Sequence, residues 1–304
     1  MYDSIIVLGP TATGKTSLAI KLAHALNSEI VNADSMYIYK YFDIGTAKPN
    51  AYELKEAKHH LIGFLDPSEC YSVANYRIDA RRVINEIWSK KMTPIIVGGT
   101  GFYIDSLIKS FSYGGVEKNI NLRNELEAEL YQFGKEYLYD KLKDIDPHSA
   151  DLLHINDTKR VIRALEIAMS TDNKKSNIIN NSDIILQNPL IIGLNLDREI
   201  LYDRINRRVD IMLDEGLIDE VNKLYKSGLT PENCNAMKGI GYKEIVSYIR
   251  GEYSLEIAIQ KIKQHSRNYA KRQITWFKRN DKIHWLNPSD DGLVNKVLEL
   301  FKNW

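Results

Sequence analysis

The segment from residue 9 to residue 16 has the spacing of a phosphate-binding loop. It reads GPTATGKT and matches the pattern G-x-x-x-x-G-K-[ST] at every fixed position. Glycines let such a loop wrap closely around an anion, and its amide groups then point at phosphate oxygens. Lys15 is expected to contact the terminal phosphate, and the Thr16 hydroxyl to ligate Mg²⁺. The candidate phosphate-binding residues are Gly9, Pro10, Thr11, Ala12, Thr13, Gly14, Lys15 and Thr16.

This motif predicts a polyphosphate site without identifying the reaction. Kinases, NTPases and other diphosphate-using enzymes share it, and the loop does not distinguish ATP from another polyphosphate. A chance glycine-rich turn is the competing interpretation. The apolar run at 5–8 before the loop and the helical spacing after it argue against that interpretation.

Two further polar residues follow apolar runs and are candidates for the same site. Asp34 follows the run that ends at Ala33, and Thr100 follows Gly98-Gly99. Strand carboxyl ends line one crevice in a parallel α/β sheet, so both side chains are expected near the phosphates. Asp34 could be a general base or hold Mg²⁺ through water, and Thr100 could donate to a leaving-group oxygen. The alternatives are a capping or turn aspartate and a turn needed only for chain reversal.

The elements that must position these residues follow from the apolar pattern. Short apolar runs predict strands, and apolar residues at helical spacing predict the helices between them. The predicted strands are 4–9, 29–33, 94–97 and 189–194, and the predicted helices are 16–26, 73–91 and 101–109. Strands that alternate with helices favour a parallel α/β sheet.

The pattern changes after Gly114-Gly115. Residues 121–170 show almost only helical spacing, and residues 172–183 are polar and predict an exposed loop. We therefore predict an α/β core made of two distant pieces, with a largely helical C-terminal part, and a helical insertion between the pieces. The predicted boundaries are 1–113 and 186–304 for the core and 114–185 for the insertion.

Basic residues gather in three stretches, although the formal net charge of the chain is only +1. Residues 265–282 hold six Lys/Arg against one Asp, with aromatic residues between them. Ala270, Ile274 and Phe277 have the spacing of a buried face in this stretch. Solvated helix faces are the usual explanation of charge runs, but beside a phosphate site they also suggest a bound polyanion. The other clusters are Lys159, Arg160 and Arg163, and Arg204, Arg207 and Arg208.

Composition adds expectations about location. The 304 residues contain no apolar run near the ~20 residues that span a bilayer, and the N-terminus lacks the basic region of a signal peptide. The two cysteines, Cys70 and Cys234, are too few and too far apart for a disulfide framework or a zinc site. We therefore expect a cytoplasmic protein without membrane contact, and a monomer because no long hydrophobic seam is evident.

Several segments taken together resemble the tRNA dimethylallyltransferases of the bacterial type, also called tRNA isopentenyltransferases. The phosphate loop alone is generic, whereas the combination is specific and spans nearly the whole chain in the family's order. The matching segments are GPTATGKT at 9–16, NADSMYIYKYFDIGTAKP at 32–49, HHLIGFLDPSECYSVANYR at 59–77, PIIVGGTGFYI at 94–104, KRVIRALEI at 159–167, RINRRVDIMLDEGL at 204–217, KGIGYKE at 238–244 and RNYAKRQITWF at 267–277. The resemblance implies a P-loop NTPase-like parallel sheet core with an inserted all-helical domain that grips the tRNA anticodon stem-loop.

The resemblance also implies a reaction and its residues. The family moves the dimethylallyl group of dimethylallyl diphosphate to N6 of the adenine on the 3′ side of the anticodon, without ATP hydrolysis. Asp34 would be the general base, Thr100 would contact the bridging diphosphate oxygen, and Lys15 and Arg208 would bind the diphosphate with Mg²⁺. The positions similar to the family's tRNA contacts are Asp34, Ser35, Met36, Tyr37, Thr100, Arg123, Lys159, Arg160, Val161, Ile162, Arg163, Lys238, Lys243, Arg267, Lys271, Arg272 and Trp276.

Two segments depart from the family's pattern. Tyr37 stands where many relatives carry Gln. The target adenine must flip out of its stack to react, and an amide contact with it would here be replaced by stacking or by one hydroxyl hydrogen bond. Residues 172–176 replace a Thr-Gly-Lys-Pro-like turn.

Three other functions compete with this interpretation. A prenyltransferase for free adenine nucleotides would not need the insertion or the basic segment at 267–277. A small-molecule kinase would need a site for an acceptor hydroxyl. A non-catalytic RNA-binding relative with a P-loop would not be expected to keep the Lys15, Thr16, Asp34, Thr100 and Arg208 set.

Overall fold

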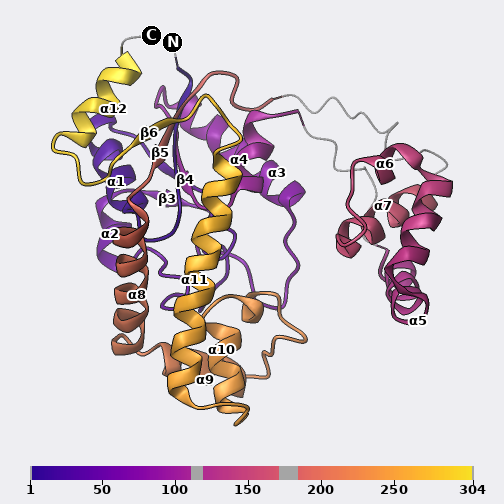
Figure 1. Ribbon diagram of the computed structural model, residues 1–304. Helices are drawn as coiled ribbons and strands as arrows, with labels where there is room; N and C mark the ends of the chain where they lie inside the picture. Colours follow the sequence, from indigo (N-terminus) through magenta and orange to yellow (C-terminus); the bar gives the residue numbers. More distant parts are fainter. Residues whose placement is uncertain (1, 111–118, 171–183, 303–304) are drawn as a thin grey trace. The chain divides into compact units, whose positions relative to one another are not determined.

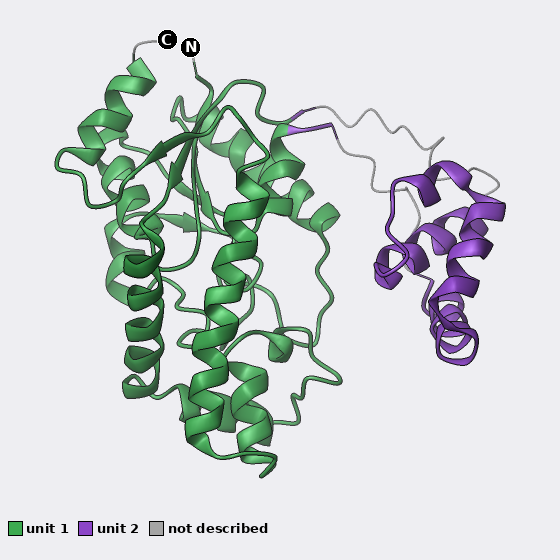
Figure 2. Ribbon diagram, in the orientation of Figure 1, with its two compact units in different colours: residues 1–108, 185–304 green, residues 109–184 purple. Residues whose placement is uncertain are grey.

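The computed structural model describes residues 2–110, 119–170 and 184–302, which form two compact units (Figures 1 and 2). The core unit comprises Met1–Ile108 and Ile185–Trp304, and the insertion unit comprises Lys109–Ile184. The predicted boundary at Gly114-Gly115 and the predicted loop at 172–183 lie outside the described residues.

The core unit contains a six-stranded parallel sheet in the order β3-β2-β4-β1-β5-β6. Its central strands are continuous apolar runs because helices cover both faces of the sheet. The strands are β1 (Ser4–Leu8), β2 (Ile30–Asn32), β3 (His59–His60), β4 (Ile95–Gly98), β5 (Pro189–Leu194) and β6 (His284–Leu286). The predicted parallel α/β sheet is therefore confirmed. Strands β3 and β6 were not predicted, because these short edge strands (HH and HWL) are not buried apolar runs.

Helices cover the two faces of the sheet. On one face α1 (Lys15–Leu26) and α12 (Leu293–Lys302) pack against the odd-numbered side chains of β1, such as Ile5 and Val7. On the other face α3 (Val73–Ser89) and α4 (Gly101–Ile108) pack against Ile6 and Leu8. The short helix α2 (Ala51–Glu56) begins at a capping box formed by Asn50 and Glu53.

The C-terminal part of the core unit is helical. It contains α8 (Arg198–Asp214), α9 (Leu217–Lys226), the 3₁₀ turn η2 (Ala236–Lys238), α10 (Tyr242–Ile249) and α11 (Leu255–Phe277). Helices α8 and α11 lie side by side, joined by a hydrogen bond from Arg267 to Asn206 (Figure 1). Ala270 and Phe277 are buried and Ile274 packs against the same apolar cluster as Ala270, which confirms the predicted buried face.

The described residues of the insertion unit are mostly helical. It contains α5 (Ile120–Ile145), α6 (Pro147–Asp151) and α7 (Thr158–Ser170), which confirms the helical prediction for 121–170. Gly134, with a φ of 85°, breaks α5 into two arms, a conformation that glycine adopts without steric cost. Leu126, Leu142 and Leu165 form the centre of this unit's own apolar core.

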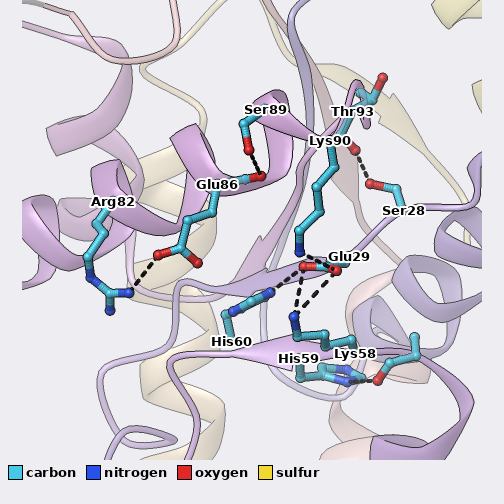
Figure 3. Close-up of polar contacts among 11 residues, drawn as sticks. Ser28, Glu29, Lys58, His59, His60, Arg82, Glu86, Ser89, Lys90 and Thr93 are labelled. Atoms are coloured by element: carbon cyan, nitrogen blue, oxygen red, sulfur yellow. Dashed lines mark hydrogen bonds and ion pairs between the residues drawn. The ribbon is translucent and has the colours of Figure 1, made fainter.

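Edge strand β3 pairs with β2 and is further anchored by one carboxylate. Glu29 accepts a hydrogen bond from His60 Nε2 at 2.7 Å and one from Lys90 Nζ at 2.9 Å, and Lys58 Nζ lies 3.4 Å away (Figure 3). Burial favours the neutral acid, but the hydrogen bonds of Lys90 and His60 outweigh it and lower the pKa of Glu29 to about 2. These contacts fix the strand that carries His59.

Neither a membrane span nor a disulfide occurs among residues 2–110, 119–170 and 184–302. No helix there is both long and apolar enough to cross a bilayer. Cys70 is exposed, whereas Cys234 is buried among the C-terminal helices, and both are free thiols.

Candidate active site

The carboxyl ends of three neighbouring strands bring the predicted catalytic residues together. In the sheet order β2-β4-β1, Asp34 follows β2, Thr100 follows β4, and the phosphate loop follows β1. One pocket opens at this edge, as expected for a parallel α/β sheet. It is lined by Lys15, Thr16, Asn32, Asp34, Tyr37, Pro49, His59, Ile62, Val97 and Gly98.

The phosphate loop has the backbone conformation that its glycines permit. Gly9 and Gly14 have φ values of 144° and 80°, and a Cβ on Gly9 would overlap the carbonyl oxygen of Leu194. Lys15 Nζ and Thr13 Oγ1 both donate to Pro10 O, at 2.7 and 2.8 Å. Burial lowers the pKa of Lys15 to about 8, with Asp34 opposing the shift and Arg208 adding to it.

Asp34 is held by its neighbours in the chain. Its amide donates to Asn32 Oδ1 at 2.8 Å, and its carboxylate Oδ1 accepts the Met36 amide at 3.0 Å. Burial raises the pKa of Asp34, although the Met36 hydrogen bond and the charges of Lys15 and Arg208 oppose that shift. A carboxylate with a raised pKa is a stronger base than an exposed one, which suits proton abstraction.

Thr100 is fixed against the segment that carries Asp34. Its amide donates to Ala33 O at 3.1 Å, and its hydroxyl accepts the Ser35 amide at 3.0 Å. A Cβ on Gly98 would overlap the Ala33 carbonyl, so this close approach of β4 to β2 needs a glycine. The glycine-rich turn therefore both reverses the chain and places the hydroxyl.

Arg208 reaches the phosphate loop from α8. Its guanidinium donates to Thr11 Oγ1 at 3.3 Å and to Ala47 O at 3.2 Å. The other arginines of its cluster point elsewhere: Arg207 pairs with Asp203 at 2.9 Å, and Arg204 donates to Ser289 at 3.4 Å. Of the predicted cluster, Arg208 is thus the member at the loop.

Tyr37 also contacts Ala47. Its hydroxyl donates to Ala47 O at 2.8 Å, and burial raises the pKa of Tyr37 to about 12, with Arg208 opposing the shift. The single hydroxyl proton is therefore already engaged. An incoming base would meet the ring or the hydroxyl oxygen rather than a free donor.

The candidate RNA contacts of the C-terminal helices fall into two groups. Lys271, Arg272 and Lys238 are exposed. Arg267 donates to Asn206 at 2.7 Å, and the Trp276 ring lies edge-on to Phe102 with centroids 6.4 Å apart, so both are engaged within the core unit. The remaining candidates are partly buried near the site (Ser35 and Met36) or beside Glu244 (Lys243).

The insertion unit divides its predicted contacts in a similar way. Lys159 and Arg160 are exposed on α7. Arg123 and Arg163 instead lie 2.5 and 2.9 Å from the buried carboxylate of Glu166.

The prediction that the whole stretch from Lys159 to Arg163 faces RNA needs a correction. Val161 and Ile162 are only 2% and 5% exposed, because the inward face of an amphipathic helix forms the unit's core. Their side chains are thus unavailable to a nucleic acid.

His59 of β3 is one of the residues that line this pocket. His59 Nδ1 lies 2.8 Å from Ala57 O, so it carries the proton and leaves Nε2 as an acceptor. Nε2 is buried and has no hydrogen-bond partner among the described residues, and burial lowers the pKa of His59. From the sequence, the His59-His60 pair is interpreted as structural or as a wall of the substrate groove, and the pocket lining agrees with the second interpretation for His59.

The donor atoms of the pocket suit Mg²⁺. The Thr16 hydroxyl and the Asp34 carboxylate are hard oxygen ligands that line the same pocket. The described residues contain no group of three or more His, Cys, Asp or Glu that could hold a metal. Such a site fits a Mg²⁺ ion that keeps water and substrate phosphates as most of its ligands.

Comparisons with known proteins agree with this geometry. The profile of a family described as IPP transferase matches residues 37–280, and one described as isopentenyl transferase matches residues 3–70. A tRNA dimethylallyltransferase of Acetivibrio thermocellus is 46% identical and covers 99% of this chain and 97% of its own length. The chain belongs to the tRNA dimethylallyltransferase family. The resemblance inferred from its motifs is confirmed.

Solved structures extend the likeness to the fold. The full-length tRNA isopentenylpyrophosphate transferase of Bacillus halodurans superimposes with a TM-score of 0.73 at 42% identity, over 100% of this chain and 95% of that chain. A eukaryotic dimethylallyltransferase acting on tRNA gives a TM-score of 0.83 at 29% identity, over 100% of this chain and 80% of that chain. Family members with 42% and 29% identity to this chain thus share its fold.

Proposed function

We propose that this enzyme transfers a dimethylallyl group from dimethylallyl diphosphate to N6 of the adenine on the 3′ side of the anticodon in tRNA. The main support for this proposal is that four predicted residues lie around one edge of the sheet: Asp34, Thr100, Lys15 and Arg208. The chain is also a member of this family. We further expect a cytoplasmic monomer.

The donor half of the site neutralises a leaving diphosphate. The loop amides, the Lys15 ammonium and the Arg208 guanidinium supply positive charge and hydrogen-bond donors where negative charge develops. Mg²⁺ held by Thr16 would neutralise further diphosphate charge when bound. The Thr100 hydroxyl, which donates to Ser35 Oγ at 3.2 Å, would turn toward the bridging oxygen when the donor binds.

The acceptor half activates a weak nucleophile. The N6 lone pair of adenine is delocalised into the ring, so the proton must leave as the new bond forms. The donor's C1 forms a bond to N6, the C1–O bond breaks with its electron pair on the diphosphate, and the Asp34 carboxylate takes the proton. Such general-base assistance typically gives about 10²–10⁴-fold. A stacked adenine cannot reach Asp34, so it must flip out at a cost of a few kcal/mol.

Two sets of exposed cations are the candidates for binding the RNA backbone. The insertion unit offers Lys159 and Arg160, and the core unit offers Lys238, Lys271 and Arg272. Neutralising phosphates releases counterions, so affinity should fall steeply as salt rises. A flat salt response would count against this RNA track.

A prenyl-transfer assay tests the proposal directly. The purified chain, Mg²⁺ and dimethylallyl diphosphate are mixed with an anticodon stem-loop whose 3′ side is A-rich, or with AMP, ADP and ATP. A mass gain on the stem-loop alone supports the proposal. Gain on the free nucleotides alone would make the chain a nucleotide prenyltransferase. No gain on either, despite stem-loop binding, would favour the non-catalytic RNA-binding alternative, and ATP turnover would favour a kinase.

A further inference from the structure

Helix α11 approaches the turn that carries Thr100 more closely than side chains on the turn would allow. A Cβ on Gly99 would overlap Gln273 Nε2, and a Cβ on Gly101 would overlap the indole of Trp276. Neither glycine has a positive φ, so backbone conformation does not explain them. These glycines instead leave room for two side chains of α11, on both sides of Thr100.

Gln273 connects this turn to the phosphate loop. Its Nε2 donates to Gly99 O at 2.9 Å, and its Oε1 accepts the Thr11 amide at 3.0 Å. The side chain is only 5% exposed, so water does not substitute readily for these two bonds. The bridge needs a donor and an acceptor on one planar group, which a carboxamide supplies.

Both partners of Gln273 belong to segments that face the reaction. Thr11 also accepts the Arg208 guanidinium at 3.3 Å. The place of a Cβ on Gly99 lies 3.5 Å from Asp34 Oδ2, so this turn is next to the base. A shift of the turn relative to the loop would therefore change the distance between the leaving diphosphate and Asp34.

We propose that Gln273 is a positioning residue for prenyl transfer. It fixes the spacing between the Thr11 end of the phosphate loop and the Gly99–Thr100 turn, so that donor and acceptor are held in line. This inference rests on the proposed function. A misplacement of about 1 Å can cost about 10²-fold in rate, and the sensitivity belongs to the chemical step rather than to RNA affinity.

Two variants test whether Gln273 acts through its two hydrogen bonds or only through the volume that it fills. Gln273→Met keeps the volume and removes both hydrogen bonds. Gln273→Glu keeps the shape but, when ionised, cannot donate to Gly99 O; the neutral acid can both donate and accept. Gln264→Met and Gln264→Glu, at an exposed position of the same helix, are the matched controls.

The measurements are single-turnover transfer to a saturating stem-loop, stem-loop Kd, and the thermal midpoint. We expect Gln273→Met to slow transfer by about 10–100-fold, with the stem-loop Kd within about twofold of wild type. For Gln273→Glu, the rate relative to wild type should rise by about tenfold as the pH falls from about 8 to about 6. Dividing by wild type at each pH removes the titration that both proteins share, and the profile of Gln273→Met, which adds no charge, separates the loss of the hydrogen bonds from the effect of a new carboxylate near Asp34.

The outcomes separate this inference from the function on which it rests. No transfer by the wild type would overturn both. Normal transfer by wild type and by a folded Gln273→Met variant would overturn the bridge alone. If Gln273→Met does not fold, the Glu variant decides: a constant fraction of wild-type activity at every pH would show that the hydrogen bonds are not the cause.

Discussion

The two units of this chain use charged side chains in different ways. In the core unit, Lys15, Asp34 and Arg208 are partly buried, and burial shifts the pKa of Lys15 down and that of Asp34 up. In the insertion unit, Lys159 and Arg160 are exposed on α7. The partly buried groups are held by hydrogen bonds, which are local for Lys15 and Asp34 and reach distant segments for Arg208, whereas the exposed ones depend only on helix geometry.

Charge alone does not mark a functional residue in this chain. Arg123 and Arg163 look like RNA contacts in the sequence, yet both pair with buried Glu166 and help to hold the insertion unit together. Burial makes the core site sensitive to single groups, because each has low-dielectric surroundings and few alternatives. The exposed cations are individually weak and replaceable.

The largest effect should come from Asp34→Ala. We expect the single-turnover rate to fall by about 10²–10⁴-fold, because the base is lost, while stem-loop affinity changes little. Rapid-quench transfer and a binding titration on the same preparation measure both. An unchanged rate would show that Asp34 is not the base. It would also contradict the proposed difference between the core unit, where single groups matter, and the insertion unit.

The next effect is the pH dependence of kcat/KM for dimethylallyl diphosphate, which reports on the free enzyme. With its pKa lowered to about 8, Lys15 loses its charge above that pH, so kcat/KM for dimethylallyl diphosphate should fall by up to about tenfold per pH unit. On the acid side, protonation of Asp34 should reduce the rate at a higher pH than for an ordinary aspartate, because its pKa is raised. Lys15→Arg keeps the positive charge at high pH, so the fall in kcat/KM above about pH 8 should disappear. If the fall persists in this variant, it is caused by another group.

A smaller effect is expected from the exposed pair of the insertion unit. Lys159→Ala combined with Arg160→Ala should weaken stem-loop binding by about tenfold and reduce the salt slope by about 1.5, since two phosphate contacts are lost. Donor affinity should be unchanged. Lys143→Ala, an exposed lysine of α5 paired with Asp140, is the control. Because the control removes one positive charge and the double variant two, a control with half the loss in binding free energy would mean that net charge, and not α7, matters.

The smallest effect should come from the anchor of β3. Glu29→Gln should lower the free energy of unfolding by about 1–3 kcal/mol near neutral pH, since hydrogen bonds to charged groups are lost. The pKa of Glu29 is lowered from 4.5 to about 2, so its contribution is present above about pH 4.5 and disappears as pH falls through about 2. Urea titrations at both ends of this window test it. A difference that does not shrink on acidification would contradict the ionic origin.

Much of the fold could be predicted from local pattern. The runs that form β1, β2, β4 and β5 are apolar because they are buried on both sides, and such runs are visible in one sequence. Strands β3 and β6 have two and three residues, and their pairing depends on partners elsewhere in the chain. The spacing of Ala270, Ile274 and Phe277 predicted a buried face, but it did not predict that Gln273 is buried as well.

Local pattern in the chain was sufficient to predict the phosphate loop, the α/β class, the family and the candidates Asp34, Thr100 and Arg208, because fixed spacing and residue type carry that information locally. The contacts of these candidates depend on the folded chain. Folding brings Arg208 to Thr11 of the phosphate loop, turns Arg123 and Arg163 toward Glu166, places His59 in the pocket lining, and joins Gln273 to the turn at Gly99. These outcomes depend on contacts between residues distant in the chain, whose geometry no local spacing encodes.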